Sequence, residues 1–235
     1  MLLVLVFAGG FVFFGVGSGS NSAGSLGDLF NNIFNGSSGP SISKYLKETE
    51  KHPNDAKAWK DLATAYSGKG RIADAIGAWT TYVSLRPKDA DALTELGSLQ
   101  VQQAQTYASQ AASAQSQQPF DATVFAPPST SKLGQALGSD PIQQAVQTQA
   151  STAVSTAQSQ ATTAYQQAVT TYQELAKLTP NDGNLQVLLA RTAESAQNYK
   201  VAIAAYEKAA KLLPDEAAQL RRLVKQLRTI APASG

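Results

Sequence analysis

A turn pattern that returns at a fixed interval constrains this chain more than any other feature of its sequence. The triplet occurs four times, as Pro53-Asn54-Asp55, Pro87-Lys88-Asp89, Pro180-Asn181-Asp182 and, less closely, Pro214-Asp215-Glu216. The first interval is 34 residues, the second is 93 and the third is again 34. Self-similarity at a period of about 20 to 50 residues is typical of repeat proteins. Because the middle interval exceeds one period by 59 residues, it predicts an insertion inside the central repeat.

Small and aromatic residues recur at matching places inside these periods. The unit over residues 56–89 contains Trp59, Leu62, Ala63, Tyr66, Ala75, Trp79 and Pro87. The unit over residues 183–216 contains Leu189, Ala190, Ala202, Tyr206, Ala209 and Pro214, but it departs from the pattern at Gln186 and Ala193. Small residues let helices approach closely, and aromatic rings fill the space between neighbours. The pattern therefore predicts helix pairs that bury their faces by stacking.

This arrangement resembles the tetratricopeptide repeat (TPR), a helix-turn-helix unit of about 34 residues. The resemblance covers about residues 41–100 and 164–230 and implies an all-α solenoid of about three repeats. The middle repeat begins with Leu93, Leu96 and Gly97 and ends with Ala168, Tyr172 and Pro180. A half repeat is expected over residues 41–51, and the apolar stripe from Leu220 to Ile230 predicts a capping helix with a polar outer face.

Residues 104–162 are expected to form the insertion, a projecting helical hairpin. Alanine and glutamine favour helix, and Ser139-Asp140-Pro141 supplies a cap and a first-turn proline for the second helix. Ile142, Val146, Ala150, Ala153, Ala157, Ala161 and Ala164 recur every three or four residues along the second helix. The small side chains among them permit close antiparallel packing against Ala104, Ala108, Ala111 and Ala114. The tip contains Phe120, Phe125 and Leu133, which either fold back on the protein or contact a partner.

The first 17 residues carry no charged side chain and are the only run that is suited to a bilayer. As a helix they would reach about 25 Å, slightly less than the roughly 30 Å hydrocarbon core. We expect an N-terminal hydrophobic helix that serves as a transmembrane anchor or an uncleaved signal, with a cleaved signal or a buried element as alternatives. Residues 18–40 are rich in Gly, Ser and Asn and are expected to be a flexible linker to the TPR domain, residues 41–235.

The composition excludes several classes of chemistry. The chain has no cysteine and a single histidine, His52, so disulfides, thiolate metal sites and sites with several imidazoles cannot form. Its net charge of +2 is far from the basic balance that nucleic-acid binding requires. We therefore expect no enzyme activity, no catalytic residues, no cofactor, no metal site and no nucleic-acid partner.

The resemblance implies a protein or peptide partner in the concave groove that the first helices of the repeats form. By the geometry of the family, the groove is lined by Lys57, Lys60, Thr64, Asp91, Thr94, Ser98, Asn184, Val187 and Arg191. Lys57, Lys60 and Arg191 make its ends basic, which favours an extended peptide of mixed but mainly acidic character. Some TPR proteins clamp C-terminal carboxylates, but Thr64, Glu95 and Leu188 stand where that clamp needs Asn, Asn and a basic residue.

These features lead to one main functional hypothesis and two alternatives. The main hypothesis is a membrane-anchored TPR scaffold at the cell envelope, with a bacterial cell membrane as the expected site and the repeats outside the cytoplasm. One alternative is an assembly factor similar to the TPR component of cytochrome c maturation, which has the same order of anchor, linker and repeats. The other is a structural subunit of an envelope complex, in which the hairpin acts as a spacer.

Overall fold

The computed structural model describes residues 42–116, 131–132 and 141–231 of the 235-residue chain, and these segments contain α-helices and no strand. The helices are α3 (Ile42–Lys51), α4 (Ala56–Gly68), α5 (Ile72–Leu85), α6 (Ala90–Ser116), α8 (Pro141–Leu178), α9 (Gly183–Ser195), α10 (Tyr199–Leu212) and α11 (Ala217–Ile230). Among the helices of these ranges, none combines the length and the apolar character that a membrane span requires. The predicted anchor (residues 1–17), the predicted linker (residues 18–40) and the tip residues Phe120, Phe125 and Leu133 lie outside the described residues.

The repeated triplets place aspartates at the start of three first helices. Asp55 Oδ1 accepts a hydrogen bond from the backbone N–H of Lys57 at 2.8 Å, at the start of α4. Asp89 and Asp182 cap α6 and α9 in the same way, through the N–H groups of Ala92 and Leu185, both at 3.0 Å. Glu216 precedes α11 without such a bond. The caps satisfy amides that have no partner inside the helix, so each triplet ends one helix and begins the next.

The turns inside the first and last repeats share one backbone geometry. Gly70 follows α4 with a φ of 68°, and Gln197 follows α9 with a φ of 57°. In both turns the left-handed residue donates its N–H to a carbonyl three residues back, at 3.0 Å for Gly70 and 2.9 Å for Gln197. The residue after it donates to a carbonyl five residues back, at 3.0 Å for Arg71 and 2.7 Å for Asn198. The repeat period is therefore visible in the hydrogen bonds of the turns as well as in the caps.

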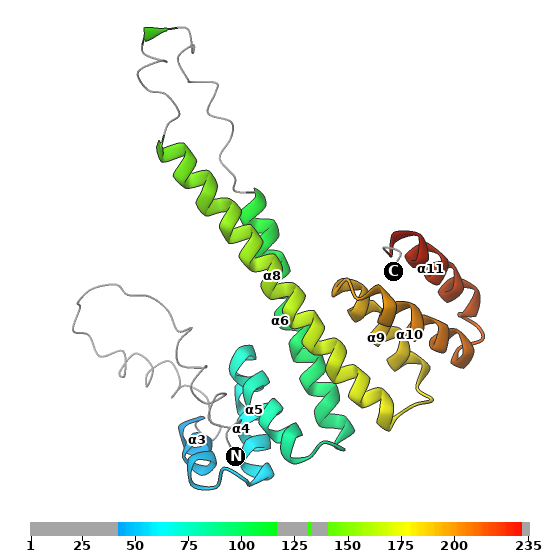
Figure 1. Cartoon of the computed structure of the whole chain (residues 1–235). Coiled ribbons are helices and arrows are strands. Elements are labelled where there is room, and N and C mark those ends of the chain that lie inside the picture. Colours follow the sequence, from blue (N-terminus) through cyan, green and yellow to red (C-terminus); the bar gives the residue numbers. More distant parts are fainter. Residues whose placement is uncertain (1–41, 117–130, 133–140, 232–235) are drawn as a thin grey trace, which may run out of the picture. The chain divides into compact units, whose positions relative to one another are not determined.

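The helices α3, α4, α5, α9, α10 and α11 flank the lower part of the α6 and α8 pair (Figure 1). We call these helices, together with that lower part, the repeat body. In Figure 1, α3, α4 and α5 lie on one side of this pair, and α9, α10 and α11 lie on the other. The core combines alanines of zero exposure with large rings: Ala63 and Ala75 accompany Trp79, and Ala168 and Ala202 accompany Tyr172 and Tyr206. These pairings are the ones that the spacing of small and aromatic residues predicts.

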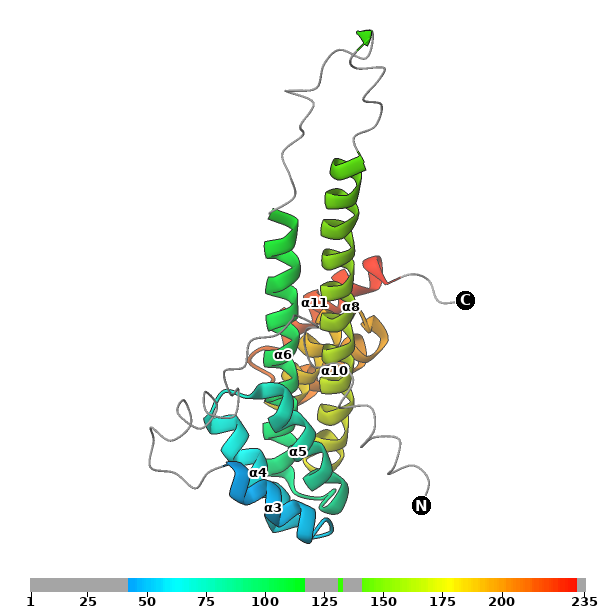
Figure 2. The ribbon, with the colours of Figure 1, turned by 90° about the vertical axis from the view of Figure 1, so that its left-hand side faces the viewer.

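The helices α6 and α8 run antiparallel as a hairpin that extends beyond the repeat body (Figures 1 and 2). At its base the hydroxyl of Thr171 donates to the side-chain carbonyl of Gln100 at 2.8 Å, and both residues are buried. Ala104, Ala111, Ala157, Ala161 and Ala164 are buried along the hairpin.

The predicted alanine stripe is wrong at Ala108 and Ala153, which are exposed, and Val146 is 44% exposed. Both helices rise by the same distance per residue from the Gln100–Thr171 contact at the base of the hairpin. The end of α6 at Ser116 therefore lies opposite about residue 155 of α8. Ala153 and Val146 therefore lie beyond the end of α6 and have no residue of that helix beside them.

Candidate partner-binding surfaces

The nine residues predicted to line the groove lie on three first helices, with three residues each on α4, α6 and α9. Eight of them are exposed, and Val187 is half-buried. The opposite faces of the same helices supply the core, as Leu62 on α4, Leu96 on α6 and Leu189 on α9 show. Each first helix thus presents a polar face away from the core, and the use of this face for binding remains a prediction.

The lysines of the groove lie beside carboxylates of the same chain. Lys57 Nζ is 2.6 Å from Asp61 Oδ2, one turn along α4, and this hydrogen bond raises the pKa of Lys57 above its usual value. Lys60 Nζ lies 3.9 Å from Asp89 Oδ2 and 5.5 Å from the centre of the Tyr82 ring. Both lysines are exposed to water, which screens the pairs, while Asp61 and Asp89 are half-buried. A partner's carboxylate can therefore compete for these lysines.

A hydrogen-bonded pair that sequence reasoning missed stands at the edge of the groove. The hydroxyl of Tyr82 on α5 donates to Asp89 Oδ2 at 2.5 Å, while the N–H of Ala92 binds Asp89 Oδ1. The Tyr82 bond, followed by the Ala92 bond, lowers the pKa of Asp89, and the bond to Asp89 raises the pKa of Tyr82. Asp89 is thus a fixed anion beside Lys60. The Pro87-Lys88-Asp89 triplet indicated that Asp89 caps α6, but no local pattern linked Asp89 to Tyr82, seven residues earlier.

Among the three cations of the predicted groove, Lys57 and Lys60 form ion pairs with described residues. Arg191 forms none with any residue that the structure describes. It lies on α9 near the hydroxyl of Tyr206, which donates to Glu194 Oε2 at 3.1 Å. Burial is the main reason why the pKa of Tyr206 rises to about 12; Glu194 adds to the rise and Arg191 opposes it. Arg191 therefore differs from Lys57 and Lys60 in forming no ion pair with a described residue, although Glu194 lies at the same Tyr206 hydroxyl.

The hydroxyl-bearing residues of the groove are exposed, and each hydroxyl donates its proton to a carbonyl of its own helix. Thr64 donates to the Lys60 carbonyl at 2.8 Å, Thr94 donates to the Ala90 carbonyl at 2.8 Å, and Ser98 donates to the Glu95 carbonyl at 3.1 Å. A hydroxyl that donates to its own helix still has oxygen lone pairs for an incoming N–H group. The surface can therefore accept hydrogen bonds from the backbone or amide groups of a peptide.

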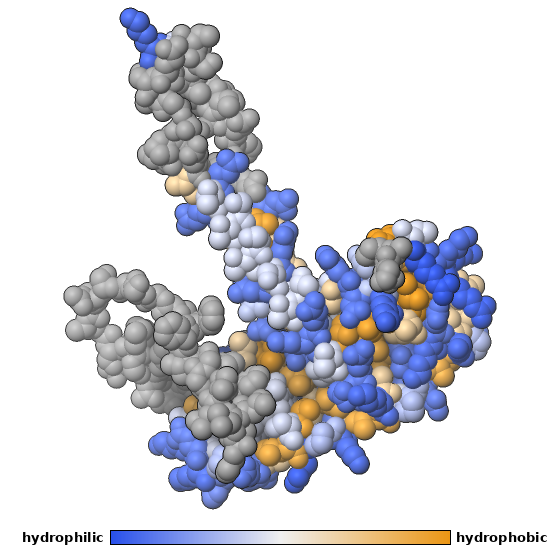
Figure 3. Space-filling model, viewed as in Figure 1, coloured by the Kyte–Doolittle hydropathy of each residue, from blue (hydrophilic) through white to orange (hydrophobic). Residues whose placement is uncertain are grey.

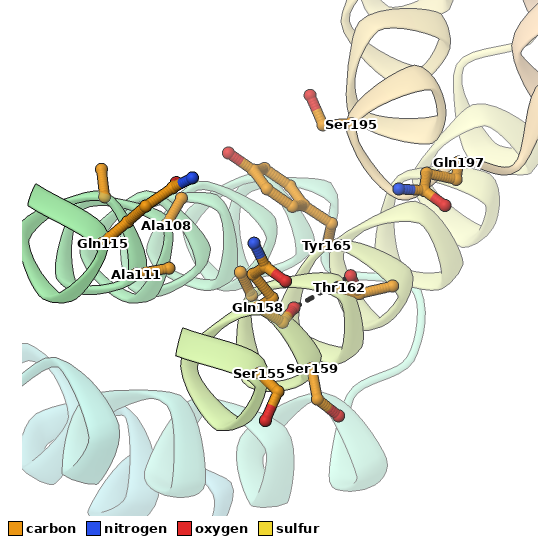
Figure 4. Close-up of a pocket in the computed structure, with 12 residues that line it drawn as sticks. Ala108, Ala111, Gln115, Ser155, Gln158, Ser159, Thr162, Tyr165, Ser195 and Gln197 are labelled. Atoms are coloured by element: carbon orange, nitrogen blue, oxygen red, sulfur yellow. Dashed lines mark hydrogen bonds between the residues drawn. The ribbon is translucent and has the colours of Figure 1, made fainter. Parts of the chain in front are cut away.

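A separate cleft of about 680 Å³ lies where the hairpin meets the turn between α9 and α10 (Figure 4). Its wall consists of alanines and uncharged polar residues: Ala108, Ala111, Ala112, Gln115, Ser155, Gln158, Ser159, Ala161, Thr162, Tyr165, Ser195 and Gln197. In Figure 3 the described part of the hairpin is mostly blue and near-white, and the larger apolar areas visible on this face lie on the repeat body. The cleft therefore lacks both the charge and the apolar patch that would indicate a specific ligand.

No metal site is apparent in the part of the chain that the structure describes. Within it, no three residues of the types His, Cys, Asp and Glu come together in a way that could hold a metal ion. The exposed faces of α4, α6 and α9 instead carry cations, carboxylates and hydroxyls. This arrangement suits recognition of a peptide or protein surface.

Two segments of the sequence match models of the tetratricopeptide repeat, namely residues 44–77 and residues 162–217. The first match covers most of α3, all of α4 and the start of α5, and the second covers the base of α8, α9, α10 and the start of α11. No curated protein matches the sequence.

A comparison with solved structures found matches to MamA and to YrrB, the latter described as a TPR protein with an unusual peptide-binding site. A crystal structure of MamA is 18% identical, covers 89% of this chain and 88% of its own, and has a TM-score of 0.43. A double mutant of MamA from RS-1 is 14% identical, covers 91% and 100%, and has a TM-score of 0.42. YrrB is 16% identical, covers 79% and 100%, and has a TM-score of 0.25.

Proposed function

We propose that this chain, two segments of which match models of the tetratricopeptide repeat, is a non-enzymatic scaffold that holds a protein partner along α4, α6 and α9. Proteins with such repeats mediate interactions between proteins. The observation that carries the proposal is the set of exposed polar side chains at matching positions of three successive first helices. A stable fold requires only the opposite, apolar faces of these helices. The polar faces are therefore available to a partner, as the peptide-binding use of such repeats requires.

The charges of the groove favour a segment of mixed but mainly acidic character. Lys57 and Lys60 have Asp61 and Asp89 beside them, whereas Arg191 has no ion pair with a described residue. We therefore place an acidic side chain of the partner at Arg191. Asp91 and the hydroxyls of Thr94 and Ser98 lie on α6, between the two basic ends, and accept hydrogen bonds from the partner's N–H groups.

Site-specific crosslinking tests this assignment. A photoreactive residue at Thr94 is expected to capture a partner in intact cells, and the double variant Lys60→Glu and Arg191→Glu is expected to abolish most of this capture. The matched control reverses the same number of charges on α11, as Arg221→Glu and Lys225→Glu, and should leave capture unchanged. All four side chains are exposed, so the melting temperatures should stay close to that of the parent protein.

The tip of the hairpin provides the competing location. If the groove variant retains capture while alanine at Phe120, Phe125 and Leu133 abolishes it, the partner binds the hairpin and the groove assignment is wrong. The identity of the crosslinked protein also separates the main proposal from its two alternatives. A cytochrome c maturation component would favour the assembly factor, and a constant stoichiometric neighbour would favour the structural subunit.

We further propose that residues 1–17 anchor this scaffold in a bacterial cell membrane, with residues 41–235 outside the cytoplasm. The support is the uncharged, apolar sequence of this segment. Membrane fractionation with protease added from one side tests the proposal. Recovery of a soluble mature chain that begins near Ser18 would contradict it, and protection of the repeat domain in intact spheroplasts would reverse the orientation.

A further inference from the structure

A polar residue occupies a core position of the last repeat. Gln186 on α9 stands six residues after Pro180, the same offset that Trp59 on α4 keeps from Pro53. The Trp59 indole N–H donates to the Pro53 carbonyl at 2.8 Å, so that ring is both packed and hydrogen-bonded. Gln186 is only 3% exposed, and its Nε2 has no hydrogen-bond partner among the described residues. The substitution thus places an unpartnered amide where the repeat pattern has an aromatic side chain.

This amide lies beneath a surface pocket of about 400 Å³ between α8, α9 and α10. Gln186 and Leu189 come from α9, Lys208 comes from α10, and α8 supplies Gln173, Glu174, Ala176 and Lys177. At 100° per residue, Gln186 lies on the far side of α9 from Asn184 and Arg191. The pocket is therefore distinct from the predicted groove and from the cleft beside the hairpin.

The charges around the pocket are not balanced. Lys177 Nζ lies 2.6 Å from Glu174 Oε1, so these two neighbours on α8 neutralise each other. Lys208 is exposed and forms no ion pair with any described residue. One amide in the floor and one cation at the rim are consequently without a partner, and both are hydrogen-bond donors.

An amide that stays unpartnered in a core destabilises the fold, and an apolar side chain at this position would avoid that penalty. From the unpartnered amide, the pocket above it and the unpaired Lys208 we infer that α8, α9 and α10 form a second binding site, which takes a single carboxylate side chain of a protein partner. The carboxylate accepts one hydrogen bond from the Gln186 amide and one from Lys208. Rotation about the last torsion of Gln186, which is low in energy, turns its NH₂ group toward the pocket.

A carboxylate fits this pair of donors better than a phosphate group does. A phosphate monoester carries nearly two negative charges and three acceptor oxygens, and proteins usually hold it with several cations or an arginine cluster. Here the Glu174–Lys177 pair adds no net positive charge, and one unpaired lysine is available. The site therefore selects an aspartate or glutamate side chain.

Nuclear magnetic resonance of the full-length, ¹⁵N-labelled chain tests the inference with two peptide probes. The first is acetyl-Gly-Glu-Gly-amide, and the second carries Gln in place of Glu. We expect the glutamate peptide to shift the side-chain NH₂ resonances of Gln186 and the glutamine peptide to leave them in place. Loss of one charge-assisted hydrogen bond in Lys208→Gln should weaken binding about tenfold.

Two further variants separate binding from folding. Lys211→Gln removes a neighbouring exposed cation of α10 that does not line the pocket, and it should bind the glutamate peptide like the parent protein. Gln186→Leu should lose binding and yet unfold at a higher temperature, because it removes the buried unpartnered amide. Equal shifts with both peptides, no shift with either, or unchanged binding in Lys208→Gln would each overturn the inference. Lys208 is exposed, so its variant decides the question even if Gln186→Leu fails to fold.

Discussion

The ring of Tyr172 on α8 packs directly against the backbone of Gly97 on α6, at the base of the hairpin. A Cβ atom at Gly97 would lie 2.8 Å from Cζ and 2.9 Å from Cδ1 of this ring, and closer still to Cε1. Both residues are buried, and Tyr172 is only 2% exposed. The contact joins the two halves of the middle repeat, because Gly97 precedes the 59-residue insertion and Tyr172 follows it.

We therefore expect Gly97→Ala to lower the free energy of unfolding by about 1 to 3 kcal/mol, because the ring cannot move away without disturbing the core. Gly68→Ala is the matched control. It is also a helical glycine, but a Cβ there would meet no atom within 4 Å, so its stability should stay the same or rise slightly. Urea unfolding of both variants checks the prediction, and equal stabilities would contradict it.

The left-handed turn residue Gln197 offers a stabilising substitution. Its φ of 57° is unfavourable for a residue with a Cβ, and the equivalent residue of the first repeat is Gly70, with a φ of 68°. Gln197→Gly should raise the free energy of unfolding by about 1 kcal/mol, since glycine adopts this conformation without strain. Gly70→Ala should lower it by a similar amount. Thermal unfolding of the two variants measures both effects, and shifts of the same sign would refute the explanation.

Two buried tyrosines should make the fold sensitive to alkaline pH. Burial raises the pKa of Tyr172 to about 12, and burial with Glu194 raises the pKa of Tyr206 to about 12, from an ordinary value of 10.0. A raised pKa favours the neutral form in the folded state, so the stabilisation is complete below pH 10 and is lost between pH 10 and 12. Within that window each tyrosine contributes a slope of up to about 1.4 kcal/mol per pH unit.

Urea unfolding at several pH values between 9 and 11.5 tests this slope. Tyr172→Phe keeps the ring and removes one titrating hydroxyl, so its stability should decline less steeply than that of the parent protein. Lysines also titrate in this range, but they are common to both chains and cancel in the comparison. Parallel curves for the two proteins would show that Tyr172 does not control the alkaline transition.

The repeat body should fold without most of the hairpin. The buried Gln100–Thr171 hydrogen bond and the Gly97–Tyr172 contact both lie below residues 104–162, so they survive replacement of this segment by a short turn. The shortened chain should therefore keep a cooperative urea transition with native helical circular dichroism. A gradual transition or dye binding typical of a molten state would mean that the hairpin is part of the core.

Local patterns of sequence identified the fold because a repeat uses the same short-range physics in each unit. Asp55, Asp89 and Asp182 act on amides two or three residues away, so the triplets reveal the caps directly. The small residues Ala63, Ala75 and Ala168 and the rings of Trp79 and Tyr172 also occupy the buried positions that their spacing predicts. Each of these features depends on a few neighbouring residues, which is why sequence reasoning reaches them.

The contacts that give the surfaces their chemistry were decided by the packing of one helix on another. Spacing alone did not show that Tyr82 bonds Asp89 beside Lys60, nor that Ala108 is exposed while Ala104 and Ala111 are buried. It marked Gln186 as a departure from the pattern but not as an amide under a pocket formed by α8 and α10. The sequence by itself determined where helices begin, end and carry apolar faces, because those properties are local. Only the tertiary structure decided which polar groups lie without partners, because that depends on the angles and distances between helices far apart in the chain.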